Sequence, residues 1–154
     1  MFRVVTVSAR HGLLMLLAAV GLVLFLPPAA AQAATHCPAR EDQPNRVFEH
    51  GCRLDRGWYV SSRSDTVRLV MQSDGNLVLR RTYDDRPLWS SHTDRGSYVQ
   101  FQNDGNLVVR DSANNPLWAS GTNGYFLALQ DDGNLVVRGY NYNPLWATGT
   151  SIYV

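Results

Sequence analysis

One short phrase occurs three times in this chain and constrains its fold more than any other feature. The copies occupy residues 72–80 (QSDGNLVLR), 102–110 (QNDGNLVVR) and 130–138 (QDDGNLVVR). A second phrase, Pro-Leu-Trp followed by two small residues, comes after each copy, at residues 87–91, 116–120 and 144–148. Two phrases in a fixed order at near-fixed spacing indicate one supersecondary unit that is used three times.

Each copy has the pattern of a β-hairpin. Apolar strand formers flank an Asp-Gly-Asn turn, and glycine accepts the positive φ that a tight turn requires. The pattern predicts hairpins over residues 68–80, 98–110 and 126–138, each followed by a polar turn and a short strand that carries a tryptophan. No part of the chain after residue 33 shows helical periodicity, so we expect an all-β domain.

The length of the repeat narrows the architecture. A propeller blade needs about 40–45 residues, and the units here are shorter. They fit three or four short strands each, and three such small sheets can bury a face only against one another, around a pseudo-threefold axis. Trp89, Trp118 and Trp146 hold equivalent positions in the repeat. We therefore expect these tryptophans to meet near that axis as part of the core.

The N-terminus has the features of a secretory signal peptide. Basic residues precede an uninterrupted run of apolar residues and glycine at 12–26, Pro27-Pro28 ends the run, and Ala31-Gln32-Ala33 offers a cleavage site. A membrane anchor is the alternative, but the run is shorter than the roughly 20 residues that a spanning helix needs. We expect a signal peptide at 1–33, a secreted, extracellular protein, and no stable membrane insertion after cleavage.

The remaining chain has the length of one domain. We expect a short N-terminal extension at 34–45 and a single β-domain at 46–154, with residues 47–48 and 58–60 as its opening strands. The signal peptide would remove two of the 14 basic residues, leaving 12 against 13 acidic ones. This near-neutral balance gives no reason to expect nucleic acid or an anionic membrane as a partner.

Cys37 and Cys52 are the two cysteines of the chain, and in an exported protein we expect them to form a disulfide. A catalytic thiol finds no support, because no histidine lies in a nucleophile–base signature and a disulfide would consume both thiols. The spacing of these cysteines and the nearby His36 and His50 matches no established zinc pattern. We predict no metal site, no cofactor and no catalytic residue.

The motif brings together five side chains of different chemistry at alternate positions. Alternation places residues on one face of a β-ribbon, apart from distortion at the turn. The predicted carbohydrate-binding residues are Gln72, Asp74, Asn76, Val78, Arg80, Gln102, Asp104, Asn106, Val108, Arg110, Gln130, Asp132, Asn134, Val136 and Arg138. Carboxylate and amide groups suit a polyhydroxylated ligand, and valine can cover its C–H surface. Each site would be shallow and weak, so three would act through avidity.

Two other interpretations of the motif stay open. Asp-Gly-Asn is by itself what a tight hairpin requires, although turn chemistry does not explain a glutamine two residues before the aspartate in every copy. A calcium loop would need six or more oxygen ligands, and each copy has one or two carboxylates. The ligand interpretation accounts for more of the repeated residues than either alternative.

The repeated phrases resemble the bulb-type (monocot mannose-binding) lectin family, whose motif is Gln-x-Asp-x-Asn-x-Val-x-Tyr. The similarity covers residues 45–154, and three copies at matching spacing make it specific. The resemblance implies a type II β-prism, with three four-stranded sheets around a tryptophan-lined axis and up to three sites for α-mannose. In that family, Gln, Asp, Asn and Tyr bind the sugar hydroxyls and Val packs on the ring carbons.

The last motif position departs from the family pattern, because Arg80, Arg110 and Arg138 stand where the family has tyrosine. Tyrosine donates and accepts hydrogen bonds, whereas arginine only donates and is charged. Two hypotheses stay open. The sites bind glycans that carry a carboxylate or phosphate, or each arginine pairs with a motif aspartate and closes the site. Plant members also commonly have a cysteine where this chain has Gly75.

Three classes of function compete. The leading one is a secreted, non-enzymatic lectin for mannose-type or anionic glycans. The alternative is a bacteriocin-like module that binds a protein or a cell-envelope polymer, although such proteins usually carry the domain in tandem. An enzyme would need an asymmetric constellation, and the polar residues here are repeated threefold. The apolar tail at 152–154 permits a homodimer formed by exchange of C-terminal strands, as in many family members.

Overall fold

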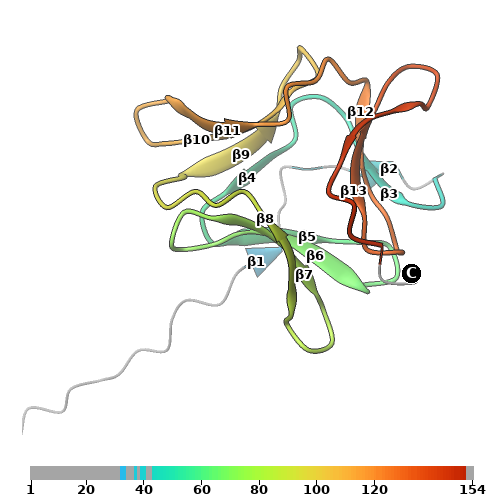
Figure 1. The fold of residues 1–154 in the computed structure, drawn as a ribbon, viewed down its shortest axis with the longest axis horizontal. Helices are drawn as coiled ribbons and strands as arrows, with labels where there is room; N and C mark the ends of the chain where they lie inside the picture. The colour runs from blue at the N-terminus through green and yellow to red at the C-terminus, as the bar shows by residue number, and fades with distance from the viewer. Residues whose placement is uncertain (1–31, 34–36, 38, 41–42, 152–154) are drawn as a thin grey trace, which may run out of the picture.

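The computed structural model describes residues 32–33, 37, 39–40 and 43–151. Within these ranges the regular elements are all β-strands, which confirms the predicted all-β domain (Figure 1). The predicted signal peptide falls largely on residues 1–31 and the apolar tail on 152–154, both outside the described residues. In the described part of the chain, no helix has the length and hydrophobicity needed to span a membrane.

The strands form three sheets, and each repeat supplies three neighbouring strands of one sheet. The first sheet contains β5 (Trp58–Ser61), β6 (Val67–Met71), β7 (Leu77–Arg81) and β8 (Pro87–Ser90), with β1 (Gln32–Ala33) parallel to β5 at its edge. The second contains β4 (Arg53–Asp55), β9 (Tyr98–Phe101), β10 (Leu107–Arg110) and β11 (Pro116–Ala119). The third contains β2 (Ala39–Arg40), β3 (Arg46–Phe48), β12 (Phe126–Leu129), β13 (Leu135–Arg138) and β14 (Pro144–Ala147).

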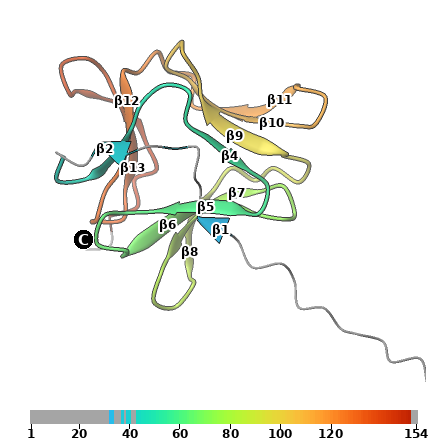
Figure 2. The ribbon, with the colours of Figure 1, turned by 180° about the vertical axis from the view of Figure 1, so that it is seen from behind.

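A further strand of each sheet comes from the N-terminal part of the domain. β3, β4 and β5 follow one another along the chain but pair with β12, β9 and β6, which belong to three different sheets. This segment can be followed from β2 past β4 to β5 in Figure 2. The opening strands expected at 47–48 and 58–60 are present. β4 had no sequence signal, because a single leucine between two charged residues is too short a pattern.

The inward faces of the three sheets share one apolar core. Leu77 and Leu79 of β7 are fully buried in it, and the equivalent residues of β10 and β13 belong to the same cluster. The rings of Trp89, Trp118 and Trp146 meet edge to face, with centroids 5.2 to 5.6 Å apart. They are half-buried and pack against this core. The predicted meeting of the three tryptophans is confirmed.

Each hairpin turn packs against the backbone of the next sheet. The carbonyl oxygen of Gly105 accepts a hydrogen bond from the N–H of Gly124 at 2.9 Å, and the turn of the first copy makes the same contact. The turn of the third copy meets the loop before β6, where a carboxylate oxygen of Asp131 accepts from the N–H of Ser64 at 2.8 Å. These contacts close the three sheets into a ring.

The substitution Gly105→Ala is expected to destabilise the fold much more than Gly121→Ala. Both glycines have positive φ, +81° and +69°, a conformation that costs an L-residue roughly 1–2 kcal/mol. A Cβ atom at Gly105 would lie 2.0 Å from the carbonyl oxygen of Gly124, whereas at Gly121 nothing lies within 4 Å. Denaturant unfolding should therefore show an additional loss of about 2 kcal/mol or more for Gly105→Ala. Equal losses would contradict the tight contact between turns.

The contact between Asp131 and the loop before β6 links stability to pH. Burial raises the pKa of Asp131, but hydrogen bonds from the loop, including the Ser64 N–H, outweigh burial, so the pKa lies below its usual value. A carboxyl group with a lowered folded-state pKa stabilises the fold above its unfolded pKa of about 3.9. That stabilisation is lost as the pH falls through the folded-state pKa.

The substitution Asp131→Asn is expected to flatten the loss of unfolding free energy below about pH 4, because it removes one group that must be protonated. Urea unfolding across that acidic range measures this slope. Asp94→Asn is the matched control, since Asp94 is 91% exposed and its only recorded ion pair, with the neighbouring Arg95, is long at 3.6 Å. An acid profile unchanged in Asp131→Asn would show that the carboxylate does not couple the two segments.

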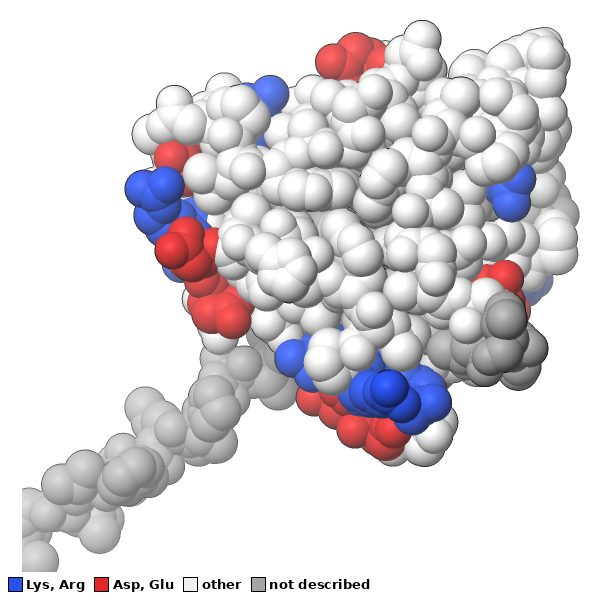
Figure 3. All heavy atoms as spheres, viewed as in Figure 1, with Lys and Arg blue, Asp and Glu red and all other residues white. Residues whose placement is uncertain are grey.

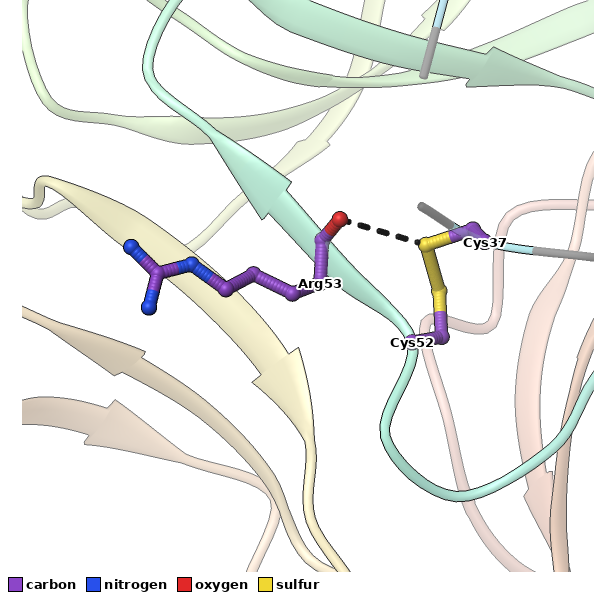
Figure 4. Close-up of a disulfide and its surroundings, with 3 residues drawn as sticks. All are labelled: Cys37, Cys52 and Arg53. Carbon is purple, nitrogen blue, oxygen red and sulfur yellow. Dashed lines mark hydrogen bonds between the residues drawn. A yellow bond between two sulfur atoms is a disulfide. The ribbon is translucent and has the colours of Figure 1, made fainter. Parts of the chain in front are cut away.

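Cys37 and Cys52 form the predicted disulfide (Figure 4). It ties the chain before β2 to the start of β4, and the 15-residue separation corresponds to about 3 kcal/mol in the loop-entropy estimate. Sγ of Cys37 lies 3.4 Å from the carbonyl oxygen of Arg53. A disulfide sulfur carries no proton, so this is a close contact rather than a hydrogen bond. Residues 39–40, in the expected extension, form β2 and pair with β3.

Candidate functional site

The motif lies on the outer face of each sheet, around the hairpin that joins the first two strands of a repeat. In the first copy, Gln72 follows β6, Asp74 and Asn76 belong to the turn, and Val78 and Arg80 lie on β7. The residues between them, such as Leu77 and Leu79, point into the core. The other two copies repeat this arrangement at equivalent positions. Alternation therefore brings the predicted residues together, and the turn contributes two of them.

The motif aspartates are used partly by the turns. In each copy, one carboxylate oxygen accepts a hydrogen bond from the backbone N–H two residues further on, at 2.9 to 3.0 Å. The aspartates that do this are Asp74, Asp104 and Asp132. This Asx turn explains why Asp precedes Gly-Asn, as the turn interpretation predicted. The second carboxylate oxygen has no recorded partner among the described residues and keeps its capacity to accept from a hydroxyl.

The motif asparagines join the two repeated phrases. In each copy, Oδ1 accepts from a hydroxyl that lies two residues after the tryptophan, at 2.9 to 3.1 Å. The same hydroxyl accepts from the N–H of the leucine that starts the middle strand, at 3.0 to 3.1 Å. The hydroxyls belong to Ser91, Ser120 and Thr148. Sequence reasoning missed this role, although a hydroxyl residue two positions after each tryptophan was its visible signal.

The substitution Asn106→Ala is expected to cost about 2 kcal/mol of stability, because Oδ1 accepts from the Ser120 hydroxyl and the Gly121 N–H and its loss leaves these donors unpaired. Asn106→Asp keeps that acceptor and should retain most of the stability, while it removes the amide N–H₂ that could donate to a ligand. Denaturant unfolding of both variants tests the difference. If both variants were equally destabilised, the Oδ1 contacts would not be what holds the turn.

The arginines hold the turn that follows the middle strand. Nη1 of each donates to a backbone carbonyl in that turn, at 2.6 to 2.8 Å. The carbonyls belong to Asp85, Asn114 and Tyr142. All three of these turn residues have positive φ, between 58° and 67°. A left-handed backbone at a non-glycine residue is strained, so a fixed hydrogen bond there stabilises the turn.

The opposite edge of the guanidinium faces the motif glutamine in the first two copies. Oε1 of Gln72 accepts from Nε and Nη2 of Arg80 at 2.8 and 2.6 Å, and Oε1 of Gln102 accepts from the same atoms of Arg110 at 3.0 and 2.9 Å. The amide is assigned with its oxygen toward arginine, because the reverse orientation would set donor against donor. Nε2 of each glutamine is thereby left to donate elsewhere.

Of the two hypotheses for the arginines, pairing with a motif aspartate is not what the described residues show, because no such contact is recorded for Arg80, Arg110 or Arg138. The recorded partners of Arg80 are Gln72 and Asp85, and Asp85 belongs to the following turn rather than to the motif. The physical reason is geometric: the motif aspartate sits at the tip of the hairpin, turned toward the backbone, while the arginine lies further along β7 beside the next turn.

The motif valines form an apolar floor that is largely covered. Val78, Val108 and Val136 are only 2 to 3% exposed, although they lie on the outer face. In the first copy, Val78 lies opposite Val70 on the neighbouring strand. On the outer face, this valine pair separates the Arg68/Arg80 pair from Gln72 at the end of the hairpin. The hydrogen bond from Arg80 to Gln72 therefore passes across the valine row. A sugar could touch this floor only if those side chains moved.

The three sites differ at the position that pairs with the arginine. The residues opposite the arginines are Arg68, Tyr98 and Phe126. Each contacts a side chain in the turn that follows the middle strand of its own repeat. The contacts are an ion pair from Arg68 to Asp85, a hydrogen bond from the Tyr98 hydroxyl to Asn114, and a ring contact at 5.0 Å between Phe126 and Tyr142. The contact between this strand position and the following turn is thus an ion pair in the first copy, a neutral hydrogen bond in the second and aromatic packing in the third.

The charges around the first copy of the motif occur in pairs. Arg68 and Arg80 both bind Asp85, and Arg81 hydrogen-bonds Asp84, which lowers the pKa of that carboxyl to about 2. Figure 3 shows a largely uncharged face, with basic and acidic groups beside one another at its margins. Among the described residues, no three His, Cys, Asp or Glu side chains gather in an arrangement that could hold a metal ion.

Comparisons with known proteins decide the family. No protein-family model matches the chain. The mannose-specific lectin of Narcissus pseudonarcissus is 47% identical over 66 residues, which cover 40% of this chain and 50% of that protein. The chain thus matches only half the length of this curated relative. Several solved structures are matched over nearly their whole length, among them the two that follow.

The Japanese Marasmius oreades lectin is 30% identical, with a TM-score of 0.66, over 79% of this chain and 97% of that one. The mannose-specific agglutinin from snowdrop (Galanthus nivalis) bulbs, complexed with methyl-α-D-mannoside, is 36% identical, with a TM-score of 0.53, over 68% of this chain and 95% of that one. The chain belongs to the bulb-type lectin family. The predicted bulb-type lectin family and type II β-prism are confirmed. Bulb-type lectins are binding proteins, so the prediction that the chain is not an enzyme is confirmed as well.

Proposed function

We propose that this bulb-type lectin is secreted and binds neutral, mannose-type glycans at the outer faces of its sheets. The observation that carries the proposal is the threefold recurrence of the same Gln, Asp, Asn and Val set in one geometry. The snowdrop agglutinin, a relative in the same family, is described as mannose-specific and was solved with methyl-α-D-mannoside. Weak single sites would gain strength from simultaneous binding to a branched glycan.

The open hydrogen-bonding groups of each site suit vicinal hydroxyls. Nε2 of Gln102 donates outward because its Oε1 is held by Arg110, and the second oxygen of Asp104 accepts. In this copy the Asn106 amide N–H₂ has no recorded partner among the described residues, whereas Nδ2 of Asn76 donates to Ser90 at 3.0 Å. A hydroxyl both donates and accepts, so neighbouring sugar hydroxyls match this mixture.

The arginines favour neutral over anionic glycans in this proposal. A carboxylate or phosphate binds arginine best along its Nε–Nη2 edge, through two parallel hydrogen bonds. Gln72 and Gln102 occupy that edge in the first two copies. Nη1 is engaged by the following turn, and Asp85 adds a negative charge in the first copy. We therefore assign Arg80 and Arg110 to positioning the glutamine amide rather than to binding an anion.

The first copy is expected to be the weakest site. Its asparagine amide nitrogen already donates to Ser90, and an ion-pair cluster of Arg68, Arg80 and Asp85 surrounds its outer edge. A sugar would have to displace these contacts without restoring them. We infer that the second and third copies provide most of the affinity.

Secretion rests on two observations in the sequence and the fold. The N-terminal segment has the pattern of a signal peptide, and the Cys37–Cys52 disulfide fits an oxidising compartment. Dimerisation through the C-terminal tail stays a prediction, because residues 152–154 lie outside the described part of the chain.

A calorimetric titration with methyl-α-D-mannoside, beside a glycan array that includes anionic glycans, tests the function. The native protein should bind mannosides and show no preference for anionic glycans. The triple variant Gln72→Glu/Gln102→Glu/Gln130→Glu keeps an oxygen acceptor at each motif glutamine, which in the first two copies faces the arginine, but it loses the N–H₂ donor. Binding should therefore fall several-fold, up to about tenfold, the loss of one neutral hydrogen bond per site.

Equal thermal unfolding of the native and triple variant proteins is the control for folding. A preference of the native protein for anionic glycans would reverse the assignment of the arginines. No binding to any glycan would overturn the lectin proposal and would favour the alternative function, binding of a protein or cell-envelope polymer on the same fold.

A further inference from the structure

The third sheet carries a group of exposed aromatic side chains that the other two sheets lack. Tyr125, Tyr140 and Tyr142 are 52, 75 and 57% exposed. Tyr125 contacts Tyr140 with ring centroids 5.3 Å apart, and Tyr142 contacts Phe126 at 5.0 Å. Exposed aromatic groups of this kind commonly mark binding surfaces, because their burial by a ligand is favourable.

The sequence of the turn after β13 makes this sheet different. Tyr140 and Tyr142 follow Arg138 by two and four residues, and the equivalent residues of the second copy are Ser112 and Asn114. Tyrosine at the left-handed position 142 is unusual, since its φ of +62° suits asparagine better. Neither tyrosine is needed for the turn itself, because the second copy forms the same turn without them.

The tyrosines line a cavity of about 350 Å³, together with Arg40, Phe126 and Asn141. A neighbouring cavity of about 210 Å³ shares Arg40, Tyr125 and Phe126 and extends toward Glu49 and His50. The larger volume lies within the range of small-ligand sites, roughly 300–1,000 Å³.

We propose that this tyrosine pocket binds a second hexose of a neutral glycan whose first hexose occupies the motif site of the third copy. The inference rests on the proposed function. Arg138 joins the two places, because it belongs to the motif while its Nη1 donates to the carbonyl oxygen of Tyr142 at 2.8 Å. Phe126 pairs with Arg138 across the strands and lines the pocket. The pocket therefore begins where the motif face ends.

The chemistry of the pocket matches a pyranose rather than an ion. Tyrosine rings offer flat apolar faces for the C–H side of a sugar, with hydroxyls at their tips for its polar groups. Asn141 adds an amide that both donates and accepts. Arg40 forms an ion pair with Glu49 at 3.2 Å, so the positive charge beside the pocket is balanced.

The test compares methyl-α-D-mannoside with an α-linked mannotriose, using NMR titrations of protein with labelled valine methyl groups. Val78, Val108 and Val136 each lie in the floor of one motif site, so their signals report binding site by site. We expect the mannotriose to bind the Val136 site at least about fivefold tighter than the monosaccharide, with a smaller or no gain at the other two sites.

The variant Tyr140→Ser/Tyr142→Asn gives the third turn the residues that the second turn already has at these positions, so the fold should be kept. It should abolish the gain at the Val136 site. Tyr83→Ser is the control, because Tyr83 is 79% exposed on the first sheet and lies outside the pocket. It should leave the gain unchanged.

Two negative results are distinguishable. If the monosaccharide shifts the Val136 signal but the mannotriose binds no more tightly, or the double variant keeps the gain, the pocket is not a sugar subsite and the lectin function stands. If neither sugar shifts any of the three valine signals, the proposed function is overturned, and the extended site with it.

Discussion

Mutual burial of three small sheets is the constraint on which the rest of this structure depends. A four-stranded sheet of about five-residue strands cannot bury its inner face alone. Here the inner leucines and valines of all three sheets form one cluster, and Trp89, Trp118 and Trp146 pack against it and against one another. With the inner faces fixed in this way, the alternate residues of the same strands are fixed on the outside, which is where the motif lies.

The outer faces serve the fold as well as any ligand. The motif aspartate closes its own turn, the asparagine joins the turn to the residue after the tryptophan strand, and the arginine supports the next turn. The residues that suit a sugar are therefore held in place by contacts that also stabilise the hairpins. Arginine at the last motif position acts in the same way, because it holds a strained turn in every copy and, in the first two copies, a glutamine amide as well. A site held so rigidly loses little side-chain entropy on binding.

Threefold repetition of sequence does not make the three sites equal. The three hairpin turns share the same aspartate contact. The residue opposite each arginine differs between the copies, and so does the turn residue that it contacts. The N-terminal strands add to the difference, because β5, β4 and β3 each bring other side chains to one sheet. In the third sheet, Arg40 of β2 and the tyrosines of the turn after β13 together line a pocket. A repeated scaffold can thus carry one shared function and local additions to it.

The sequence alone determined the strands of the repeats, the meeting of the tryptophans, the disulfide and the residues of the motif, because these depend on local turn chemistry and on alternation within a few residues. It could not assign the partners of Arg80 and Asn76, the pairing of Leu54 with Val99, or the pocket beside Phe126. Those contacts join residues from different turns or different strands. Their geometry is set only when the N-terminal segment has been distributed over three sheets, and no local pattern encodes that distribution.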